Sequence, residues 1–472
     1  MKTLFWHDYE TWGVNPMRDK PAQFAGIRTD EALNVIGEPV NILCRPADDT
    51  LPHPEACLVT GLTPQYAHEH GMPENEFAAA VQRELGQAGT CGVGYNSIRF
   101  DDEVTRNLLY RNFYDPYGRE WQQGNSRWDI IDMLRLCYVV RPEGINWPSN
   151  DDGAPSFRLE LLTAANDLAH EDAHDALSDV RATIAMAALV RKVQPKLYQH
   201  AFERRDKKSV RADLALGSEQ MRLHISSKFG AAHAYASLVL PVAMHPTNKN
   251  EIICLDLRQS PEPVFDLEVD VLAQKLFSPS SELPPGEARV PLKSVHLNRC
   301  PIVLTPALID SKVAERMCID VGQCEQHRDQ YLQLAGKHGA IQKKLQSLFS
   351  ARVYDNHDVE ERLYDGFMAD ADKRVMHSVV TSSARQLADN VFVFEDERLP
   401  ELFWRYRARN FPAQLTRDEA GEWREFCRIV FERELPERIA VLDKLQADPS
   451  LAPEKASVLE QLRQYFAEKT TI

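Results

Sequence analysis

Several features that would assign a chain to a common class are missing from this sequence of 472 residues. It contains no apolar run near the ~20 residues that a membrane-spanning helix needs. Its first residues, MKTLFWHD, reach charged side chains too early for a secretory signal peptide. The nine cysteines are scattered and include no C-x-x-C pair, which argues against a disulfide framework and against structural zinc. We therefore expect reduced cysteines, no membrane association and a cytoplasmic location.

Positive charge is also scarce. The chain has 55 Lys and Arg against 70 Asp and Glu, which gives a net charge of −15. This total lowers the expectation of nucleic-acid binding, because phosphate contacts usually draw on a basic surface. A basic stretch nevertheless runs from Arg191 to Arg211, where Glu203 and Asp206 are the only acids. The acidic total therefore does not exclude a nucleic-acid substrate.

The hydrophobic content, 43%, is that of a globular protein, and the length suggests two to four domains of ~100–200 residues each. Residues 1–195 alternate strand and helix signals, which predicts an α/β domain. Residues 196–350 contain short β-like runs separated by Pro, Asn and Asp, which predicts a small β-rich domain with inserted helices. Residues 351–472 have helical spacing and predict an all-helical domain.

Within the first domain, periodicity predicts a strand at Thr3–His7, strands on both flanks of a turn near Asn34 and another strand from Cys91. Helices are predicted at Glu76–Leu85, Asp102–Phe113, Arg127–Val139, Phe157–Leu168 and Asp175–Val193.

Two acids, Asp8 and Glu10, follow the apolar start of the first predicted strand in FWHDYETW. Side chains alternate along a strand, so both carboxylates project to one side, about 7 Å apart. Two such acids repel each other, and a site that keeps both ionised needs a cation, for which magnesium or manganese suits oxygen ligands. An isolated D-x-E is nevertheless more often a pair of solvated acids, so further residues must support a metal site.

Two later segments supply such residues. In GYNSIRFDDEVTRN, Asp101 and Asp102 open a predicted helix, where acids also serve as cap and first-turn residues. In AHDALSDVRATIAMAALV, His174 precedes a helix that contains Asp179; alone, this segment is more often a capped amphipathic helix with a surface histidine. Together, four acids can hold two divalent ions about 3.5–4 Å apart, and a histidine can accept a proton, which serves phosphodiester hydrolysis.

The order and spacing of these motifs resemble the DEDDh exonuclease superfamily, whose fold is ribonuclease-H-like. The segments FWHDYETWG, KPAQFAGIRTD, YRNFYDPY, RPEGINWPSNDDGAPSFRLE and AHDALSDV are similar to the bacterial exodeoxyribonuclease I family, and VAMHPTNKN, LYDGFMADAD and RYRARNFP extend the similarity over nearly the whole chain. The resemblance implies a 3′-to-5′ exonuclease domain at 1–195, an SH3-like β-rich domain at 196–350 and a helical domain at 351–472 that closes over the DNA path.

When the roles of the family's catalytic residues are transferred to the matching positions, the resemblance implies metal binding by Asp8, Glu10, Asp101 and Asp179. It implies general-base catalysis by His174. Asp101 is preferred to Asp102 because it follows Phe100 directly. Asp179 is preferred to Asp175 because four residues separate it from the histidine. The expected cofactor is Mg²⁺, two ions per site, with Mn²⁺ as an alternative; one ion would activate water and the other would stabilise the departing 3′ oxygen.

A grip on unpaired DNA calls for basic residues interleaved with aromatic rings on which bases stack. The segment RNLLYRNFYDPYGREW has this composition, although aromatic residues at such density are more often core. FWRYRARNF in the helical part has the same character. The resemblance also places Glu10 at the terminal sugar. The expected substrate contacts are Glu10, Arg106, Tyr117, Trp121, Arg135 and Arg158.

The resemblance implies a processive exodeoxyribonuclease that is specific for single strands, releases nucleoside 5′-monophosphates and works in DNA repair and recombination. It also implies a protein partner, the acidic C-terminal tail of single-stranded-DNA-binding protein, with Arg141 as one docking residue. Two alternatives remain: a 3′-to-5′ exoribonuclease of the same superfamily, and a non-catalytic single-stranded-DNA-binding scaffold, against which the intact set of acids and histidine speaks. We expect a monomer.

Overall fold

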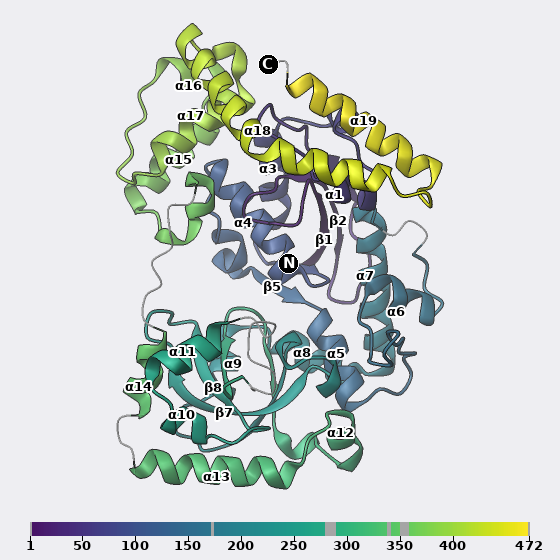
Figure 1. Ribbon diagram of the computed structural model, residues 1–472, viewed down its shortest axis with the longest axis vertical. Helices are drawn as coiled ribbons and strands as arrows, with labels where there is room; N and C mark the ends of the chain where they lie inside the picture. The colour runs from purple at the N-terminus through teal and green to yellow at the C-terminus, as the bar shows by residue number, and fades with distance from the viewer. Residues whose placement is uncertain (1, 171–173, 279–288, 338–340, 350–357, 471–472) are drawn as a thin grey trace. The chain divides into compact units, whose positions relative to one another are not determined.

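The computed structural model describes residues 2–170, 174–278, 289–337, 341–349 and 358–470. The chain forms two compact units. The first comprises Met1–Arg127, His170–Ile184 and Asp355–Ile472, and the second comprises Trp128–Ala169 and Ala185–Tyr354. A five-stranded sheet lies at the centre of each (Figure 1).

The first sheet is mixed and has the strand order β3-β2-β1-β4-β5. β1 (Thr3–Thr11) pairs antiparallel with β2 (Pro21–Thr29) and parallel with β4 (Thr90–Gly94). β3 (Val40–Leu43) and β5 (Ser126–Asp129) form the edges. Because parallel strands need a crossover connection, the helices between them cover the sheet. This part of the chain is α/β, as its alternating signals predict.

The first strand differs from its prediction. β1 continues to Thr11 instead of ending at His7, so Asp8 and Glu10 lie within the strand. The helix predicted from Arg127 is also wrong at its start, because β5 occupies Ser126–Asp129 and the helix begins only after it.

Strand β2 is missing from the sequence-based prediction, although it is buried almost throughout. Its segment PAQFAGIRT contains Gln, Gly and Arg, which weaken a strand pattern. The structure explains two of them. A Cβ on Gly26 would lie 2.3 Å from Cζ of Phe5 on the neighbouring strand, and the Arg28 guanidinium lies 4.9 Å from the centre of the same ring. Gly26 and Arg28 are therefore explained by their contacts with Phe5 on the neighbouring strand.

Helices α3 (Glu74–Leu85) and α4 (Asp101–Arg111) pack on one face of the first sheet. Their apolar side chains pack against Phe5 and Tyr9 of β1 in a buried cluster that also includes Phe24, Phe77, Val81, Leu85, Val104 and Leu108. The short helices α1 (Pro54–Thr60) and α2 (Pro64–His70) each begin with a proline at the first helical position, after a capping His53 or Thr63.

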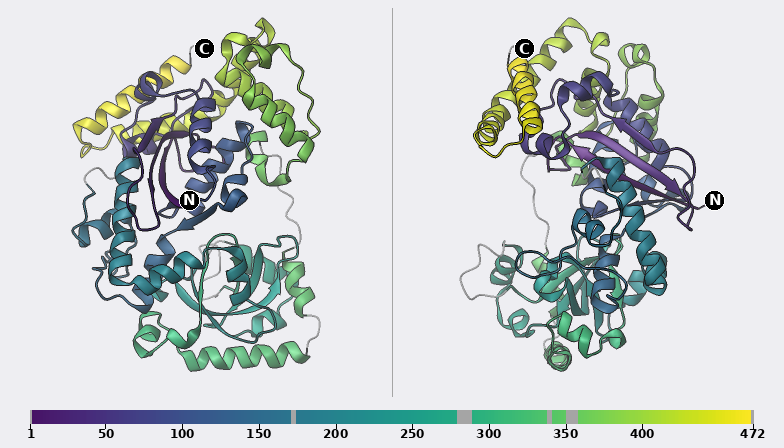
Figure 2. Two further views of the ribbon diagram at one scale, coloured as in Figure 1. Left: turned by 180° about the vertical axis from the view of Figure 1, so that it is seen from behind. Right: turned by 90° about the vertical axis from the view of Figure 1, so that its right-hand side faces the viewer.

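The described residues from 358 to 470 are helical, as predicted. They form the 3₁₀ helices η8 (Val359–Asp365) and η9 (Pro412–Gln414) and the helices α15 (Asp370–Thr381), α16 (Ala384–Asp389), α17 (Leu399–Asn410), α18 (Arg417–Gln446) and α19 (Pro453–Lys469). Figure 2 shows α18 and α19 side by side. Apolar clusters join this region to the sheet part of the unit, one around Trp12, Trp423 and Phe431 and another around Tyr110, Phe113 and Tyr406.

The arginines of α17 form ion pairs inside the first unit. Arg409 Nη2 lies 2.6 Å from Asp49 Oδ2, and Lys20 Nζ lies 2.7 Å from the same oxygen. The side chains of Arg409 and Asp49 are only 2% and 5% exposed. The other two arginines, Arg405 and Arg407, pair with Asp358 and Glu419. Arg409 therefore serves as a joint between the helical region and the loop after β3, whereas Arg405 and Arg407 form ion pairs within the helical region.

The second unit contains an antiparallel sheet with the order β10-β6-β7-β8-β9. Its strands are β6 (Arg222–Ile225), β7 (Ala236–Met244), β8 (Glu251–Asp256), β9 (Leu292–His296) and β10 (Ile302–Leu304). Its helices are α5 (Ile131–Val140), α6 (Leu159–Ala165), α8 (Pro195–Glu203), α9 (Lys207–Asp213), α10 (Glu262–Asp266), α11 (Val269–Phe277), α12 (Ser311–Arg316), α13 (Val321–Lys337) and α14 (Ile341–Leu348). Helix α7 (Ala176–Val193) spans residues of both units. The predicted β-rich region with inserted helices is present.

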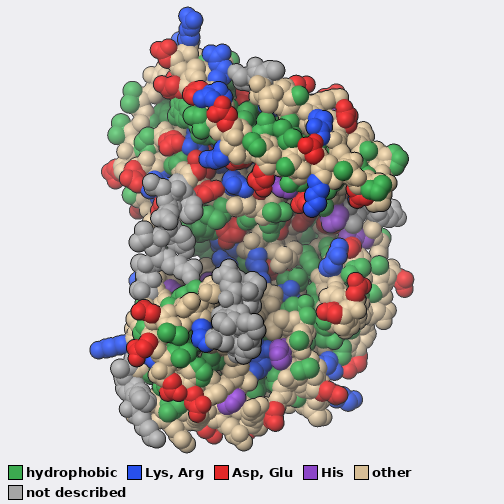
Figure 3. Space-filling view, viewed as in Figure 1, with side chains coloured by type: hydrophobic (Ala, Val, Ile, Leu, Met, Phe, Trp, Pro, Cys, Tyr) green, Lys and Arg blue, Asp and Glu red, His purple; other side chains and the backbone are tan. Residues whose placement is uncertain are grey.

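All nine cysteines lie in the described part of the chain, where none of them forms a disulfide and only Cys318 is exposed. Lys and Arg side chains are interspersed with Asp and Glu over the face drawn in Figure 3. In the part of the chain that the structure describes, every helix is too short or too polar to cross a membrane.

Replacing Arg409 by Met tests the buried joint. The substitution leaves Asp49 buried with Lys20 as its remaining cation, and removing one partner of a buried ion pair costs about 3–5 kcal/mol. We expect the free energy of unfolding, measured by urea denaturation, to fall by that amount. The control is Arg385→Met, whose side chain is 89% exposed in its pair with Asp389 and whose loss should cost less than about 1 kcal/mol. Equal effects of the two substitutions would contradict the joint.

Candidate active site

Three carboxylates converge on one face of the first sheet. Asp8 and Glu10 lie two residues apart on β1 and therefore project to the same side. Asp179 comes from the first turn of α7. One carboxylate oxygen from each of the three lies within 4.8 Å of the others. Among the described residues, the acidic, His or Cys side chains that lie close enough together to hold a metal ion are these three carboxylates.

Asp101 reaches the same region from the start of α4. β4 pairs with β1 only as far as Trp6, which leaves that edge of β1 open beyond this point. There the Asp101 carboxylate accepts a hydrogen bond from the backbone amide of Tyr9 at 3.2 Å. The chain between β4 and α4 turns tightly, and a Cβ on Gly94 would lie only 2.5 Å from the Cβ of Ser97. Glycine at the end of β4 therefore allows α4 to begin beside β1.

The electrostatics of the cluster favour a bound cation. Burial raises the pKa of Asp8 well above its usual range, and the charges of Asp101, Glu10 and Asp179 raise it further. Burial, followed by repulsion from Asp179 and Asp101, raises the pKa of Glu10 to about 9. Burial also raises the pKa of Asp179. A divalent cation among these oxygens would relieve the repulsion, and an all-carboxylate donor set suits Mg²⁺ or Mn²⁺.

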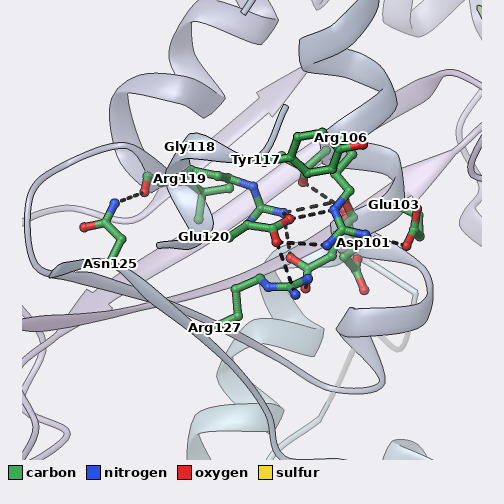
Figure 4. A network of polar contacts seen from close by, with 12 residues as sticks. Asp101, Glu103, Arg106, Tyr117, Gly118, Arg119, Glu120, Asn125 and Arg127 are labelled. Atoms are coloured by element: carbon green, nitrogen blue, oxygen red, sulfur yellow. Dashed lines mark hydrogen bonds and ion pairs between the residues drawn. The ribbon is translucent and has the colours of Figure 1, made fainter. Parts of the chain in front are cut away.

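Asp102, the neighbour of Asp101, has a different environment. Its carboxylate accepts hydrogen bonds from Arg119 Nη2 at 2.7 Å and from Arg127 Nη1 at 2.8 Å. Burial disfavours its charge, but Arg127 and Arg119 outweigh burial and lower the pKa of Asp102. Figure 4 shows the side chains of Arg119, Arg127 and Arg106 close together, next to Asp101. Asp102 is therefore neutralised within the protein, whereas Asp101 remains the candidate metal ligand.

Two histidines lie near Asp179. The backbone amide of His174, the predicted general base, hydrogen-bonds to the Asp179 carboxylate, and its side chain is exposed. His170, which the sequence reasoning misses, places its Nε2 2.5 Å from Asp179 Oδ1. The signal for it was present, because His170 stands four residues before His174 in HEDAH. Residues 171–173 between them lie outside the described residues. The assignment of the base to His174 stays a prediction.

The predicted substrate residues of the first unit fall into two kinds. Arg106 is buried, and its Nε lies 2.6 Å from Glu120 Oε1, so its guanidinium is held inside the protein, which favours a structural role. Trp121 is 67% exposed. Tyr117 is partly buried and meets Phe367 edge to face, with 5.6 Å between ring centres. Phe367, which the sequence reasoning misses within LYDGFMADAD, is 85% exposed.

Three further predicted contacts belong to the second unit. Arg135 is buried, with Nη1 2.6 Å from Asp132 Oδ1 and its guanidinium 4.8 Å from the centre of the Tyr235 ring. Arg158 is exposed and pairs with Glu160, and Arg141 is exposed. These contacts with DNA and with a partner stay predictions, and burial favours a structural role for Arg135.

Comparison with known proteins identifies the family. Three family models match in chain order: an exonuclease model at residues 5–187, an exonuclease I SH3-like domain at 205–351 and an exonuclease I C-terminal domain at 357–469. Exodeoxyribonuclease I of Escherichia coli (strain K12) is 43% identical over 472 residues, which cover 99% of this chain and 98% of that protein. The chain belongs to the exodeoxyribonuclease I family. The resemblance and the three-part fold class are confirmed, while the boundaries at residues 195 and 350 stay predictions.

Solved structures of exonuclease I share this fold. Exonuclease I from Methylocaldum szegediense has a TM-score of 0.95 at 46% identity, covering 99% of this chain and 100% of that chain. E. coli exonuclease I in complex with a dA16 oligonucleotide has a TM-score of 0.93 at 43% identity, with the same coverage. A zinc-bound E. coli exonuclease I–single-stranded DNA complex is 41% identical and covers 100% of both chains, with a TM-score of 0.95. A structure described as SSB/exonuclease I with an inhibitor is 42% identical, with a TM-score of 0.92, and covers 99% of this chain and 100% of that chain.

Metal binding should stabilise the wild-type protein through this cluster. A ligand that binds only the folded state adds about 2.7 kcal/mol at a hundredfold excess over its Kd, so Mg²⁺ or Mn²⁺ added after EDTA treatment should raise Tm. Asp8→Asn should lose most of this rise. Without metal, Asp8→Asn should unfold no earlier than wild type, because it removes one of the repelling charges.

Differential scanning calorimetry measures both effects. The exposed acid Glu69 provides the control, since Glu69→Gln should keep the full rise in Tm. A metal-free Asp8→Asn variant that unfolds several degrees below wild type would contradict the interpretation of Asp8 as a repelling metal ligand.

Proposed function

We propose that this protein hydrolyses single-stranded DNA from its 3′ end and releases nucleoside 5′-monophosphates, with two Mg²⁺ ions as its cofactors. The observation that carries the proposal is the convergence of Asp8, Glu10 and Asp179, with Asp101 beside them. The chain also aligns over nearly its whole length with exodeoxyribonuclease I. A relative bound to an oligonucleotide supports the same substrate class.

The four carboxylates would hold the metal ions. When bound, divalent ions supply Lewis-acid chemistry for activating water and for stabilising the departing 3′ oxygen. His174 stands next to the start of α7, where its imidazole can accept the proton of the attacking water. Glu10 lies two residues from Asp8 on the same side of β1 and is proposed to contact the terminal sugar.

Aromatic side chains of the first unit would hold the strand. Tyr117, the exposed Trp121 and the exposed Phe367 offer ring faces, and base stacking on such rings is insensitive to sequence. The helical region is fixed to the sheet part of the same unit by two apolar clusters and by the Arg409 joint. We infer that this attachment encloses the path of the DNA strand over the metal site. An enclosed path favours repeated cleavage without release of the strand, and it is too narrow for duplex DNA.

We also propose that the acidic C-terminal tail of single-stranded-DNA-binding protein binds this protein, with Arg141 as one exposed contact. The related SSB/exonuclease I structure supports such a partner. A role in DNA repair and recombination follows from that partner and substrate. The absence of disulfides among the nine cysteines, all of them in the described residues, favours the reducing cytoplasm. A monomer is proposed, and size-exclusion chromatography with light scattering would test it.

Product analysis tests the proposed function directly. End-labelled single-stranded DNA, duplex DNA and single-stranded RNA are incubated with the protein, with and without Mg²⁺. We expect mononucleotides from single-stranded DNA alone and only with metal. Asp8→Ala should abolish release while single-strand binding remains measurable by gel shift. Faster release from RNA would make the protein an exoribonuclease, and turnover by Asp8→Ala would remove the metal assignment.

A second experiment separates the two histidines near Asp179. His174→Ala should lower the single-turnover cleavage rate by roughly 10²–10⁴-fold, the usual contribution of a positioned general base. Mn²⁺ binding, measured calorimetrically, should stay near the wild-type value. His170→Ala is the comparison variant. If His170→Ala loses this rate while His174→Ala retains it, the base is His170.

A further inference from the structure

Gln23 lies beside the carboxylate cluster. Its segment, KPAQFAGIRTD, supports the family resemblance, but none of its residues has been assigned a catalytic or binding role. It stands on β2 directly opposite Glu10 on β1. Residues opposite each other in an antiparallel pair present their side chains on the same face. The amide of Gln23 therefore lies on the face that carries Asp8 and Glu10, and the residue is only 5% exposed.

Gln23 ties the start of α7 to this sheet. Its Nε2 donates to Asp175 Oδ1 at 2.9 Å, and its Oε1 accepts from the backbone amide of Ala176 at 3.5 Å. Asp175 in turn caps the helix. Its Oδ2 accepts from the amide of Ser178 at 3.0 Å, and its carbonyl accepts from the amide of Asp179 at 3.0 Å. One buried amide thus connects β2 with the turn that presents Asp179.

The residue before this cap needs such a restraint. His174 has a φ of 71°, in the left-handed region that non-glycine residues adopt rarely and at a cost. It keeps this conformation only when its neighbours are held. Asp175, the next residue, is held from one side by its own helix and from the other by Gln23.

The orientation of the amide is fixed from a second strand. Gln23 Nε2 also donates to Asn41 Oδ1 on β3 at 2.9 Å. With two carbonyl or carboxylate oxygens facing its nitrogen, the Gln23 amide can present only its oxygen to Ala176. A chain of hydrogen bonds, called the anchor below, therefore runs from Asn41 on β3 through Gln23 on β2 to the start of α7.

We propose that Gln23 is a positioning residue for the nuclease reaction: by holding Asp175, it fixes where His174 lies relative to Glu10 and the scissile phosphate. This rests on the proposed function, with His174 as the general base. Asp8, Glu10 and Asp101 are placed by β1 and α4 without Gln23. Asp179 is the one acid of the cluster on the helix that Gln23 anchors. Loss of Gln23 therefore impairs proton transfer directly and weakens metal binding to a smaller extent, through Asp179 alone.

The test variant is Gln23→Met, which keeps the length of the side chain and removes its hydrogen bonds. Thr29→Val is the matched control, because Thr29 shares the strand and face of Gln23 and loses a buried hydrogen bond from Trp6 Nε1, 2.9 Å long. We expect Gln23→Met to lower the single-turnover rate by roughly 10- to 100-fold. DNA affinity and Mn²⁺ affinity should stay within about threefold of wild type, and Thr29→Val should keep the wild-type rate.

A double-mutant cycle decides whether Gln23 acts through the histidine. In the His174→Ala background, Gln23→Met should cause no further loss of rate. If the two losses multiply, or if Gln23→Met weakens Mn²⁺ binding as much as it lowers the rate, Gln23 does not act through His174 and the inference is overturned.

Hydrogen exchange gives a readout that does not depend on activity. The amides of residues 176–179 should exchange faster in Gln23→Met than in wild type and should be unchanged in Thr29→Val. Unchanged exchange in Gln23→Met would overturn the anchor. If wild-type protein released no mononucleotides, the proposed function would fail, while the exchange experiment would still decide whether Gln23 holds α7.

Discussion

Repulsion among buried carboxylates is the constraint on which the rest of this structure depends. Asp8 and Glu10 are held on one face of β1, and their ionised forms are disfavoured by burial and by each other. A fold that brings Asp101 and Asp179 to the same place loses stability unless a cation binds there. The surrounding elements hold the acids together. The strand pairing fixes β1, the Tyr9 amide fixes Asp101, and the cap of α7 fixes Asp179.

The contrast with other buried acids of this chain supports that interpretation. Asp102 lies between Arg119 and Arg127, and Asp49 lies between Arg409 and Lys20. These acids serve the architecture, and cations of the protein neutralise them. For Asp8 and Glu10 burial is the largest influence, and the charges that act on them come from other carboxylates. The chain has a net charge of −15, so acids are common in it. A structural carboxylate is recognised by the Arg or Lys side chains beside it, and a functional one by the other carboxylates beside it.

The sequence predicts that Asp8 and Glu10 share one face of a strand, because backbone periodicity is a local property. The choice of Asp101 over Asp102 and of Asp179 over Asp175 rests on the family resemblance. The sequence also predicts the order of the three regions from local periodicity. It misses β2, since Gly26 and Arg28 are selected by contact with Phe5 on another strand. It does not reveal that Arg106 and Arg409 meet carboxylates after folding, because no local pattern shows these partners. The role of Gln23 is invisible for the same reason.

The most direct test of the account is a crystal of the wild-type protein soaked in Mn²⁺, with anomalous diffraction data to locate the metal. The account predicts anomalous density between the carboxylates of Asp8, Glu10, Asp101 and Asp179. Density at another site, with none among these four side chains under conditions in which the protein cleaves DNA, would contradict it.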